Sequence, residues 1–187
     1  MTTTRKKKPQ KRASARATRP WSSLKRNGSN LNVEDFLTFK LTRLSNALRN
    51  NLTKPYLEEF GLSLPEWRLL ALIARFAPMR FSEVTTRSGM DKGQVSRTLR
   101  VMEKRGLTKL TTIRTRGRSA EALAAPVMVS ITAKGKSLYK SVLPVARARQ
   151  AEMLLTLNQS ERLALYDTLD KLSAAIGATA AMDYAAE

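Results

Sequence analysis

Residues 81–106 carry the pattern that most restricts how this chain can fold. A short helical stretch over residues 82–88 is followed by a glycine-containing turn at residues 89–90. Asp91 can cap a second helix, which continues until Gly106 stops it. Two helices joined by a turn of this kind have the layout of a helix-turn-helix. We therefore expect a mainly α-helical fold built around this segment.

The second helix of this segment has two chemically different sides. At about 100° per residue, Val95, Leu99 and Met102 share one side, which we expect to be buried. Gly93 lies on the opposite side, where it either lets the backbone approach a groove or is a tolerated surface glycine. Gln suits adenine and Arg suits guanine in the major groove. The candidate DNA-binding residues of this helix are Lys92, Gly93, Gln94, Ser96, Arg97, Arg100 and Lys104.

A β-hairpin is expected after this helix. Residues 107–114 and the alternating apolar residues of 127–131 read as two strands around a loop rich in Arg and Gly. An Arg-Gly-Arg tip suits the narrow minor groove of A·T-rich DNA. Placed after a helix-turn-helix, such a hairpin predicts a winged helix with three further candidate DNA contacts: Arg114, Arg116 and Arg118.

The remaining apolar patterns predict helices on both sides of this core. Apolar residues recur at steps of three and four over residues 33–52, until Pro55 bends or ends that helix. Residues 64–76 are apolar nearly all round and predict a central buried helix, and a further helix over 133–156 contains Pro144. Helix caps are predicted at Ser63 with Glu66, at Thr132, and at Asn158 with Glu161.

The positive charge of the chain is concentrated in two blocks. The net charge is +19, from 34 Lys and Arg against 15 Asp and Glu. Residues 1–30 hold ten cations and no acid, and residues 80–118 hold eleven cations against three acids. The blocks indicate a polyanionic partner, DNA or RNA before a membrane, with simple solubility as the alternative. Because residues 1–30 contain almost nothing apolar, we expect them to be a disordered basic tail.

The composition argues against several other classes of protein. The chain has no Cys and no His, which excludes disulfides, thiol sensing and a zinc site built from those ligands. No run of about eighteen apolar residues is present, and the basic N-terminus lacks the apolar core of a secretory signal. We therefore expect a cytoplasmic protein without cofactor or metal. An enzyme is poorly supported, since no nucleophile–base pair or phosphate-binding loop is evident.

Three stretches of the sequence carry a family resemblance: LSLPEWRLLALIARF, FSEVTTRSGMDKGQVSRTLRVMEKRGLTKL and VSITAKGKSLY. They resemble the MarR (multiple antibiotic resistance regulator) family, over most of residues 31–176. The resemblance implies a homodimer that binds a palindromic operator on double-stranded DNA, usually as a repressor released by a small ligand. It also implies a winged helix-turn-helix domain at 61–132, and a helical dimerisation region formed by 31–60 and 133–187.

The wing departs from the pattern of the family that the chain resembles. Wings of that family usually carry an Asp-x-Arg pair, whereas position 116 here is Arg and no acid precedes Arg118. The loop is also several residues longer. Which of the wing arginines enters the minor groove therefore stays open.

The same resemblance implies an effector crevice between the dimerisation region and the winged helix. Aromatic walls with two or three cations would suit an aromatic acid or its CoA thioester. The alternative is that Trp67 belongs to the core while Lys40 and Arg43 are solvated. The candidate effector residues are Phe36, Phe39, Lys40, Arg43, Trp67 and Arg68.

One alternative function remains beside that of a sequence-specific regulator. A sequence-independent, architectural DNA-binding protein would need only the basic tail and the net charge. The preference for specific over random DNA separates the two.

Overall fold

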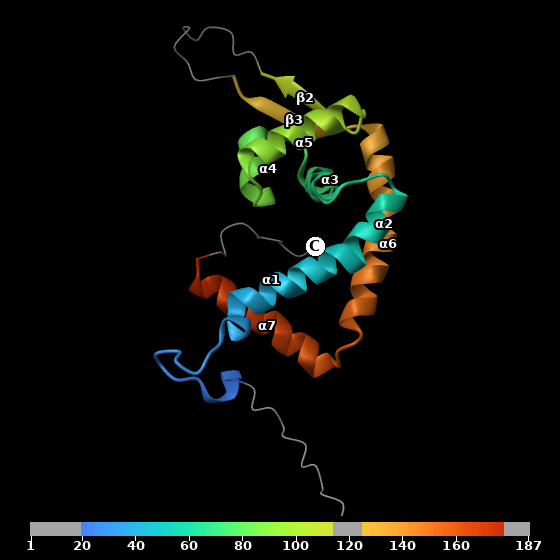
Figure 1. Ribbon diagram of the computed structural model, residues 1–187. Coiled ribbons are helices and arrows are strands. Elements are labelled where there is room, and N and C mark those ends of the chain that lie inside the picture. The colour runs from blue at the N-terminus through green and yellow to red at the C-terminus, as the bar shows by residue number, and fades with distance from the viewer. Residues whose placement is uncertain (1–19, 114–124, 178–187) are drawn as a thin grey trace, which may run out of the picture. The chain divides into compact units, whose positions relative to one another are not determined.

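The computed structural model describes residues 20–113 and 125–177 of the chain (Figure 1). The chain divides into two compact units, residues 1–46 and 47–187, and each is considered by itself. The first nineteen residues of the expected basic tail lie outside the described residues. So do the wing arginines Arg114, Arg116 and Arg118.

The described part of the first unit begins with ordered turns. Its elements are two short 3-10 helices, η1 (Pro20–Ser23) and η2 (Val33–Asp35), followed by the start of α1 (Leu37–Leu48). The Trp21 indole Nε1 donates to the Asp35 carbonyl at 2.7 Å, and the Asn30 amide donates to the carbonyls at both ends of η1. Residues 20–30 therefore form ordered turns and not the disordered segment that we expected. Disorder was predicted from the low apolar content of residues 1–30, and that content does not reveal local hydrogen bonds made by indole and amide side chains.

The expected first helix is divided into three pieces around Pro55. After α1, a π-helical turn, η3 (Arg49–Thr53), leads into α2 (Lys54–Glu59), where the Lys54 N–H bonds to the Arg49 carbonyl. Proline lacks an N–H and its ring clashes with the carbonyl four residues earlier, so an unbroken α-helix cannot pass through it. The wider turn before Pro55 accommodates the ring, and the chain continues as the helix α2.

Helix α3 (Leu64–Phe76) lies at the centre of the second unit and contacts α4, α5 and α6 (Figure 1). Its predicted capping box is confirmed. The Ser63 N–H donates to Glu66 Oε2 at 2.8 Å, and Ser63 Oγ accepts from the Glu66 N–H. Leu69, Leu70 and Ile73 are fully buried, which confirms the expected central helix.

The helix-turn-helix consists of α4 (Phe81–Ser88) and α5 (Lys92–Lys104). Gly89 ends α4 in the left-handed conformation, with φ of 61°, which favours glycine. Asp91 is the N-cap of α5, as predicted, and its Oδ1 accepts from the Gln94 N–H at 3.0 Å. The predicted buried side of α5 is also confirmed, since Val95, Leu99 and Met102 are all inaccessible to solvent.

The small sheet has three antiparallel strands, not the two expected from sequence. Strands β2 (Thr108–Thr112) and β3 (Val127–Ile131) form the hairpin, and β1 (Met79–Arg80) adds to the other edge of β3. Leu110 and Met79 both pair with Val129 from opposite sides. A two-residue strand is too short to produce an alternating pattern, so β1 depends on a pairing partner distant in sequence.

The two C-terminal helices start at the predicted caps. Thr132 and Asn158 accept from the backbone N–H groups of Gly135 and Glu161 at 3.0 Å each. They begin α6 (Ala133–Leu154), within which Pro144 lies, and α7 (Gln159–Ala175). At the start of α6, a Cβ atom on Gly135 would overlap the Leu107 carbonyl oxygen. The backbones of α6 and of the α5–β2 junction therefore approach more closely than a side chain allows.

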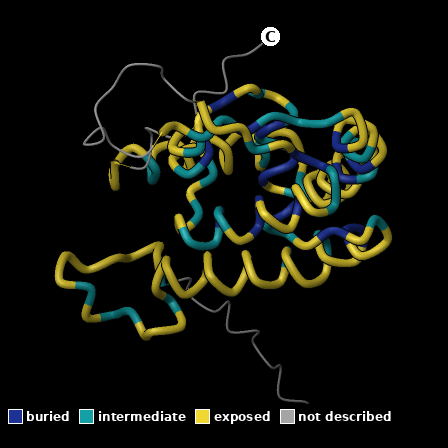
Figure 2. The backbone as a smooth tube through the Cα atoms, turned by 90° about the horizontal axis from the view of Figure 1, so that it is seen from above, coloured by how far each residue is buried: buried dark blue, intermediate teal, exposed yellow. Residues whose placement is uncertain are grey.

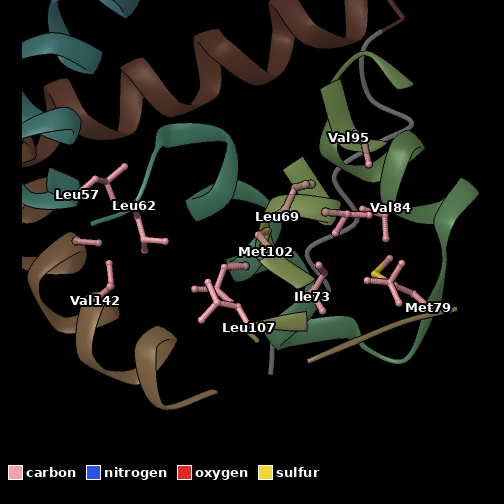
Figure 3. Close-up of a cluster of buried hydrophobic side chains, with 14 of the residues drawn as sticks. Leu57, Leu62, Leu69, Ile73, Met79, Val84, Val95, Met102, Leu107 and Val142 are labelled. Atoms are coloured by element: carbon pink, nitrogen blue, oxygen red, sulfur yellow. The ribbon is translucent and has the colours of Figure 1, made fainter. Parts of the chain in front are cut away.

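One apolar core holds the second unit together. Side chains from α2, α3, α5 and α6 meet in it, and Figure 3 shows Leu69, Ile73 and Met102 pointing into the same cluster. In Figure 2 the buried positions are dark blue among the teal and yellow of the surrounding turns. In residues 20–113 and 125–177, no helix is long and apolar enough to span a membrane, and no three Asp or Glu residues form a metal-binding group.

Candidate nucleic-acid interface

Helix α5 brings the seven predicted residues of the helix-turn-helix onto one surface. Opposite the buried stripe, three exposed cations surround the half-buried Gly93, while Gln94 and Ser96 lie half-buried at the borders. Lys92 is exposed in the first turn of α5, beside this side. Together these exposed cations form the cationic face: Lys92, Arg97, Arg100 and Lys104.

An apolar residue that we did not predict also lies on this face. Val101 is 48% exposed, one helical turn after Arg97 and next to Arg100. The rotation of about 100° per residue could have placed Val101 on this face. A single valine among cations, however, does not by itself indicate a DNA contact. A valine side chain has the apolar surface that can contact a thymine methyl group, and arginine side chains can donate hydrogen bonds to guanine.

The C-terminal end of α5 is held by an ion pair with α3. Arg105 Nη1 lies 2.5 Å from Glu66 Oε1, and Glu66 is only 6% exposed. Burial acts to raise the pKa of Glu66, but hydrogen bonds from Ser63 and the charge of Arg105 outweigh it and lower the pKa below its ordinary value. Sequence reasoning identified Glu66 only as part of a capping box, because its second partner lies 39 positions away.

The same end of α5 is also held by the start of α6. Thr132 Oγ1 donates to the Gly106 carbonyl at 2.6 Å, and Lys134 Nζ donates to the Arg105 carbonyl at 2.9 Å. These bonds satisfy carbonyls that a helix end leaves without intrahelical partners. The cationic face is therefore carried on a helix whose C-terminal end is fixed from two directions.

One cation of the second basic block, Arg87, lies against an aromatic ring. The Arg87 guanidinium lies 4.7 Å from the centre of the Phe76 ring, and that of Arg75, just outside the block, lies 5.1 Å from it. Both distances are in the range of cation–π attraction. A charge count cannot distinguish these arginines from those on the cationic face.

The six candidate effector residues divide between the two units. In the first, Lys40 is 3.9 Å from an Asp35 oxygen and the Arg43 guanidinium lies 5.9 Å from the Phe39 ring centre, and Phe36 is exposed. In the second, Arg68 is exposed and Trp67 stacks on Tyr139, with 5.9 Å between ring centres. Trp67 also packs against the core, which accounts for it as a packing residue.

A hollow that we did not predict lies within the second unit, between η3 and the end of α6. Its volume is about 350 Å³, and an ion pair between Arg149 and Glu152 lies on its wall. None of the candidate effector residues lines it. The lining residues are Asn51, Leu52, Pro55, Arg149, Glu152, Met153 and Thr156.

The arrangement of α4, a glycine turn, α5 and a hairpin sheet defines the class of protein. It is a winged helix-turn-helix protein. A model of the MarR family matches residues 60–119, which contain the whole helix-turn-helix. This segment, about a third of the chain, is thus similar to the MarR family.

Solved structures of that family have the same fold. The MarR/EmrR family regulator from Acinetobacter sp. ADP1 is 22% identical, with a TM-score of 0.65 over 80% of this chain and 100% of that one. MepR of S. aureus, in complex with DNA, is 13% identical, with a TM-score of 0.64 over 75% and 98%. NadR in complex with 4-hydroxyphenylacetate is 20% identical, with a TM-score of 0.57 over 74% and 92%. No curated protein matches the sequence.

Proposed function

We propose that this protein is a sequence-specific DNA-binding transcriptional regulator whose helix α5 enters the major groove. The observation that carries the proposal is the cationic face of α5, which is exposed while the opposite side is buried in the core. Arg97 and Arg100 would read guanine, Gln94 would read adenine, and Lys92 and Lys104 would neutralise phosphates. From the wing, one of Arg114, Arg116 and Arg118 would enter the adjacent minor groove.

Selection of bound sequences from a random duplex pool tests this proposal. A regulator should enrich one sequence and bind it at least about 10³-fold more tightly than random DNA at physiological salt. The matched variants are Arg97→Ala on α5 and Arg149→Ala on α6, which remove the same exposed side chain. Only the first should weaken specific binding. If the wild type binds the enriched sequence and random DNA with nearly equal affinity, the alternative is favoured: an architectural protein that binds DNA without regard to sequence.

We also propose that the protein acts as a homodimer on a pseudo-palindromic operator. Helix α7 leaves large apolar side chains in solvent, including Leu163 at 60%, Tyr166 at 68% and Leu169 at 45% exposure. Leu155, between α6 and α7, is 70% exposed. Monomeric proteins rarely leave a contiguous apolar surface of this kind uncovered. A second copy with two-fold symmetry would cover it and present two α5 helices to two half-sites.

The molar mass in solution tests the dimer. Replacing both Leu163 and Leu169 with Glu should convert a dimer into a monomer in light scattering at micromolar concentration. Lys171→Glu is the control, because it changes the net charge equally and Lys171 lies on another side of α7 at about 100° per residue. A monomeric wild type, or a dimer that the double variant leaves intact, contradicts this part of the proposal.

We propose, finally, that a small aromatic acid or its CoA thioester releases the protein from its operator, so that it acts as a repressor. The structural similarity to NadR, which was solved with 4-hydroxyphenylacetate, supports a ligand of this class. Within the first unit, Lys40 and Arg43 would bind the acid group, and Phe36 and Phe39 would contact the ring. A panel of aromatic acids and thioesters should raise the melting temperature and lower operator affinity. Lys40→Met with Arg43→Met should abolish both effects.

A further inference from the structure

The Glu103 side chain of α5 bonds to the backbone of strand β2. Its Oε1 accepts a hydrogen bond from the Leu110 N–H at 2.9 Å. Across the hairpin, the Ile113 N–H donates to the Pro126 carbonyl at 3.0 Å, and alternate residues of an antiparallel strand bond to the same side. The N–H of Leu110, three residues earlier, therefore points away from β3. Glu103 takes the place that a further strand would occupy at this edge of the sheet.

This bond attaches β2 to α5 at a second point. In the turn between them, the Gly106 N–H donates to the Glu103 carbonyl and the Leu107 N–H donates to the Met102 carbonyl, at 2.8 and 2.9 Å. Those bonds hold the chain as far as Leu107, and the Leu110 bond holds it three residues further on. The Leu110 side chain also packs against the core, but apolar contacts are non-directional, whereas a hydrogen bond specifies a distance and an angle. The direction of the strand relative to the helix is therefore fixed by the pair of attachments.

Glu103 lies beside the cationic face, on the side of α5 that carries Ser96. At about 100° per residue, its direction differs by about 60° from that of Arg100. The strand that it holds is thus attached next to the proposed DNA-binding surface. Because its negative charge repels phosphate, attraction to DNA does not account for this residue.

Each acid of residues 80–113 accepts a hydrogen bond from a backbone N–H. This segment contains three acids. Glu83 accepts from the Arg80 N–H at 2.7 Å and caps α4, and Asp91 accepts from the Gln94 N–H at 3.0 Å and caps α5. These two acids serve the helix at whose start they lie, whereas Glu103 joins its helix to another element.

We propose that Glu103 is a positioning residue that holds the hairpin in a fixed direction beside the cationic face. A hairpin that pivots must lose that freedom when it settles into one arrangement on DNA, and this loss weakens binding. A specific complex needs one arrangement of helix and hairpin, while random DNA tolerates many. The inference rests on the proposed DNA-binding function and adds to it a determinant of the preference for specific over random DNA that contacts no base.

Glu103→Ala and Glu103→Gln separate the hydrogen bond from the charge. Both remove one negative charge, but glutamine keeps a side-chain oxygen that accepts from the Leu110 N–H. Glu103→Ala should lower the ratio of specific to random affinity roughly fivefold, the loss expected for one hydrogen bond. Glu103→Gln should keep the ratio near that of the wild type, and both variants should bind random DNA slightly more tightly. If both lower the ratio equally, the charge is responsible and the inference is overturned.

Amide hydrogen exchange at Leu110 measures the bond itself. Because this N–H points away from β3, it should lose its protection in Glu103→Ala and keep it in Glu103→Gln. Unchanged exchange in Glu103→Ala would overturn the inference.

Glu83→Ala provides the matched control. It removes the same side chain, one negative charge from the same block and one hydrogen bond to a backbone N–H, that of Arg80. The ratio of specific to random affinity should be unchanged in Glu83→Ala. A fall as large as that in Glu103→Ala would assign the effect to the charge or to general loss of stability, and would overturn the inference.

A multiple variant tests whether Glu103 acts through the hairpin. When Arg114, Arg116 and Arg118 are all replaced with Ala, Glu103→Ala should not lower the ratio further, because the contact that it positions is gone. An equal fall in both backgrounds would show that Glu103 acts on α5 or on DNA directly and would overturn the inference. An unchanged ratio in Glu103→Ala alone would also overturn it, while leaving the proposed function intact. A wild type that selects no sequence would overturn both.

Discussion

Glu66 and Arg105 join the N-terminal cap of α3 to the C-terminal end of α5. Glu66 Oε2 accepts from the Ser63 N–H and hydroxyl at 2.8 and 2.7 Å, and its Oε1 lies 2.5 Å from Arg105 Nη1. One buried carboxylate thus serves two elements that are distant in sequence. Because its lone pairs are engaged on both oxygens, burial of its charge is compensated.

Glu66→Gln should destabilise the protein by about 2 kcal/mol at neutral pH, less than the loss of a fully buried pair because the Arg105 side chain is 35% exposed. The pKa of Glu66 is lowered from its ordinary value of 4.5. Its contribution to stability is therefore fully present above that value and is lost as the pH falls below it. Urea unfolding of the wild type and of Glu66→Gln at several pH values checks this. If their difference in the free energy of unfolding stays constant down to pH 3, the prediction is wrong.

Gly135→Ala should destabilise the protein severely, by at least about 3 kcal/mol, because the new Cβ overlaps the Leu107 carbonyl oxygen and the backbone must move. In an open helix the same substitution would stabilise by about 1 kcal/mol. The change in melting temperature of Gly135→Ala shows whether the substitution stabilises or destabilises the protein. A raised melting temperature would show that α6 and the α5–β2 junction are further apart than the structure places them.

Arg97→Ala should cost about 1–3 kcal/mol in binding to the selected sequence and relax one base pair of it. Arg97 is exposed, so the folded protein should be unaffected. Competition binding with the selected duplex, its single-base-pair variants and random duplexes measures the loss of affinity and the loss of preference at that base pair. An equal loss on random DNA would assign Arg97 to a phosphate contact.

Deletion of residues 1–19 removes eight cations and leaves the ordered turns from Pro20 onward in place. If these cations neutralise phosphates, each contact contributes about −0.9 to the slope of log K against log salt. In a dimer the slope should flatten by several units, with specific and random binding weakened alike. Salt titrations on both duplexes test this. A lower ratio of specific to random affinity would show instead that the tail reads the minor groove.

The local patterns of the sequence predicted most of the elements that position the candidate interface. The caps at Ser63, Asp91, Thr132 and Asn158 were identified correctly, because capping depends on residues within one helical turn. The buried side of α5 followed from its 3.6-residue period. Strand β1, the π-helical turn before Pro55 and the hydrogen-bonded turns at 20–30 were not predicted, because each depends on partners or geometry outside such a pattern.

The sequence by itself determined that a cationic helix face would stand opposite a buried one, since the rotation per residue places every α5 side chain relative to the others. Only the tertiary structure decided how that helix is held. The Glu66–Arg105 pair, the bonds from Thr132 and Lys134 to the end of α5, and the approach of Gly135 to Leu107 join residues about 25 to 40 positions apart. Such contacts form only when packing of the apolar core brings their elements together, because a periodic pattern specifies directions within one element and not distances between elements.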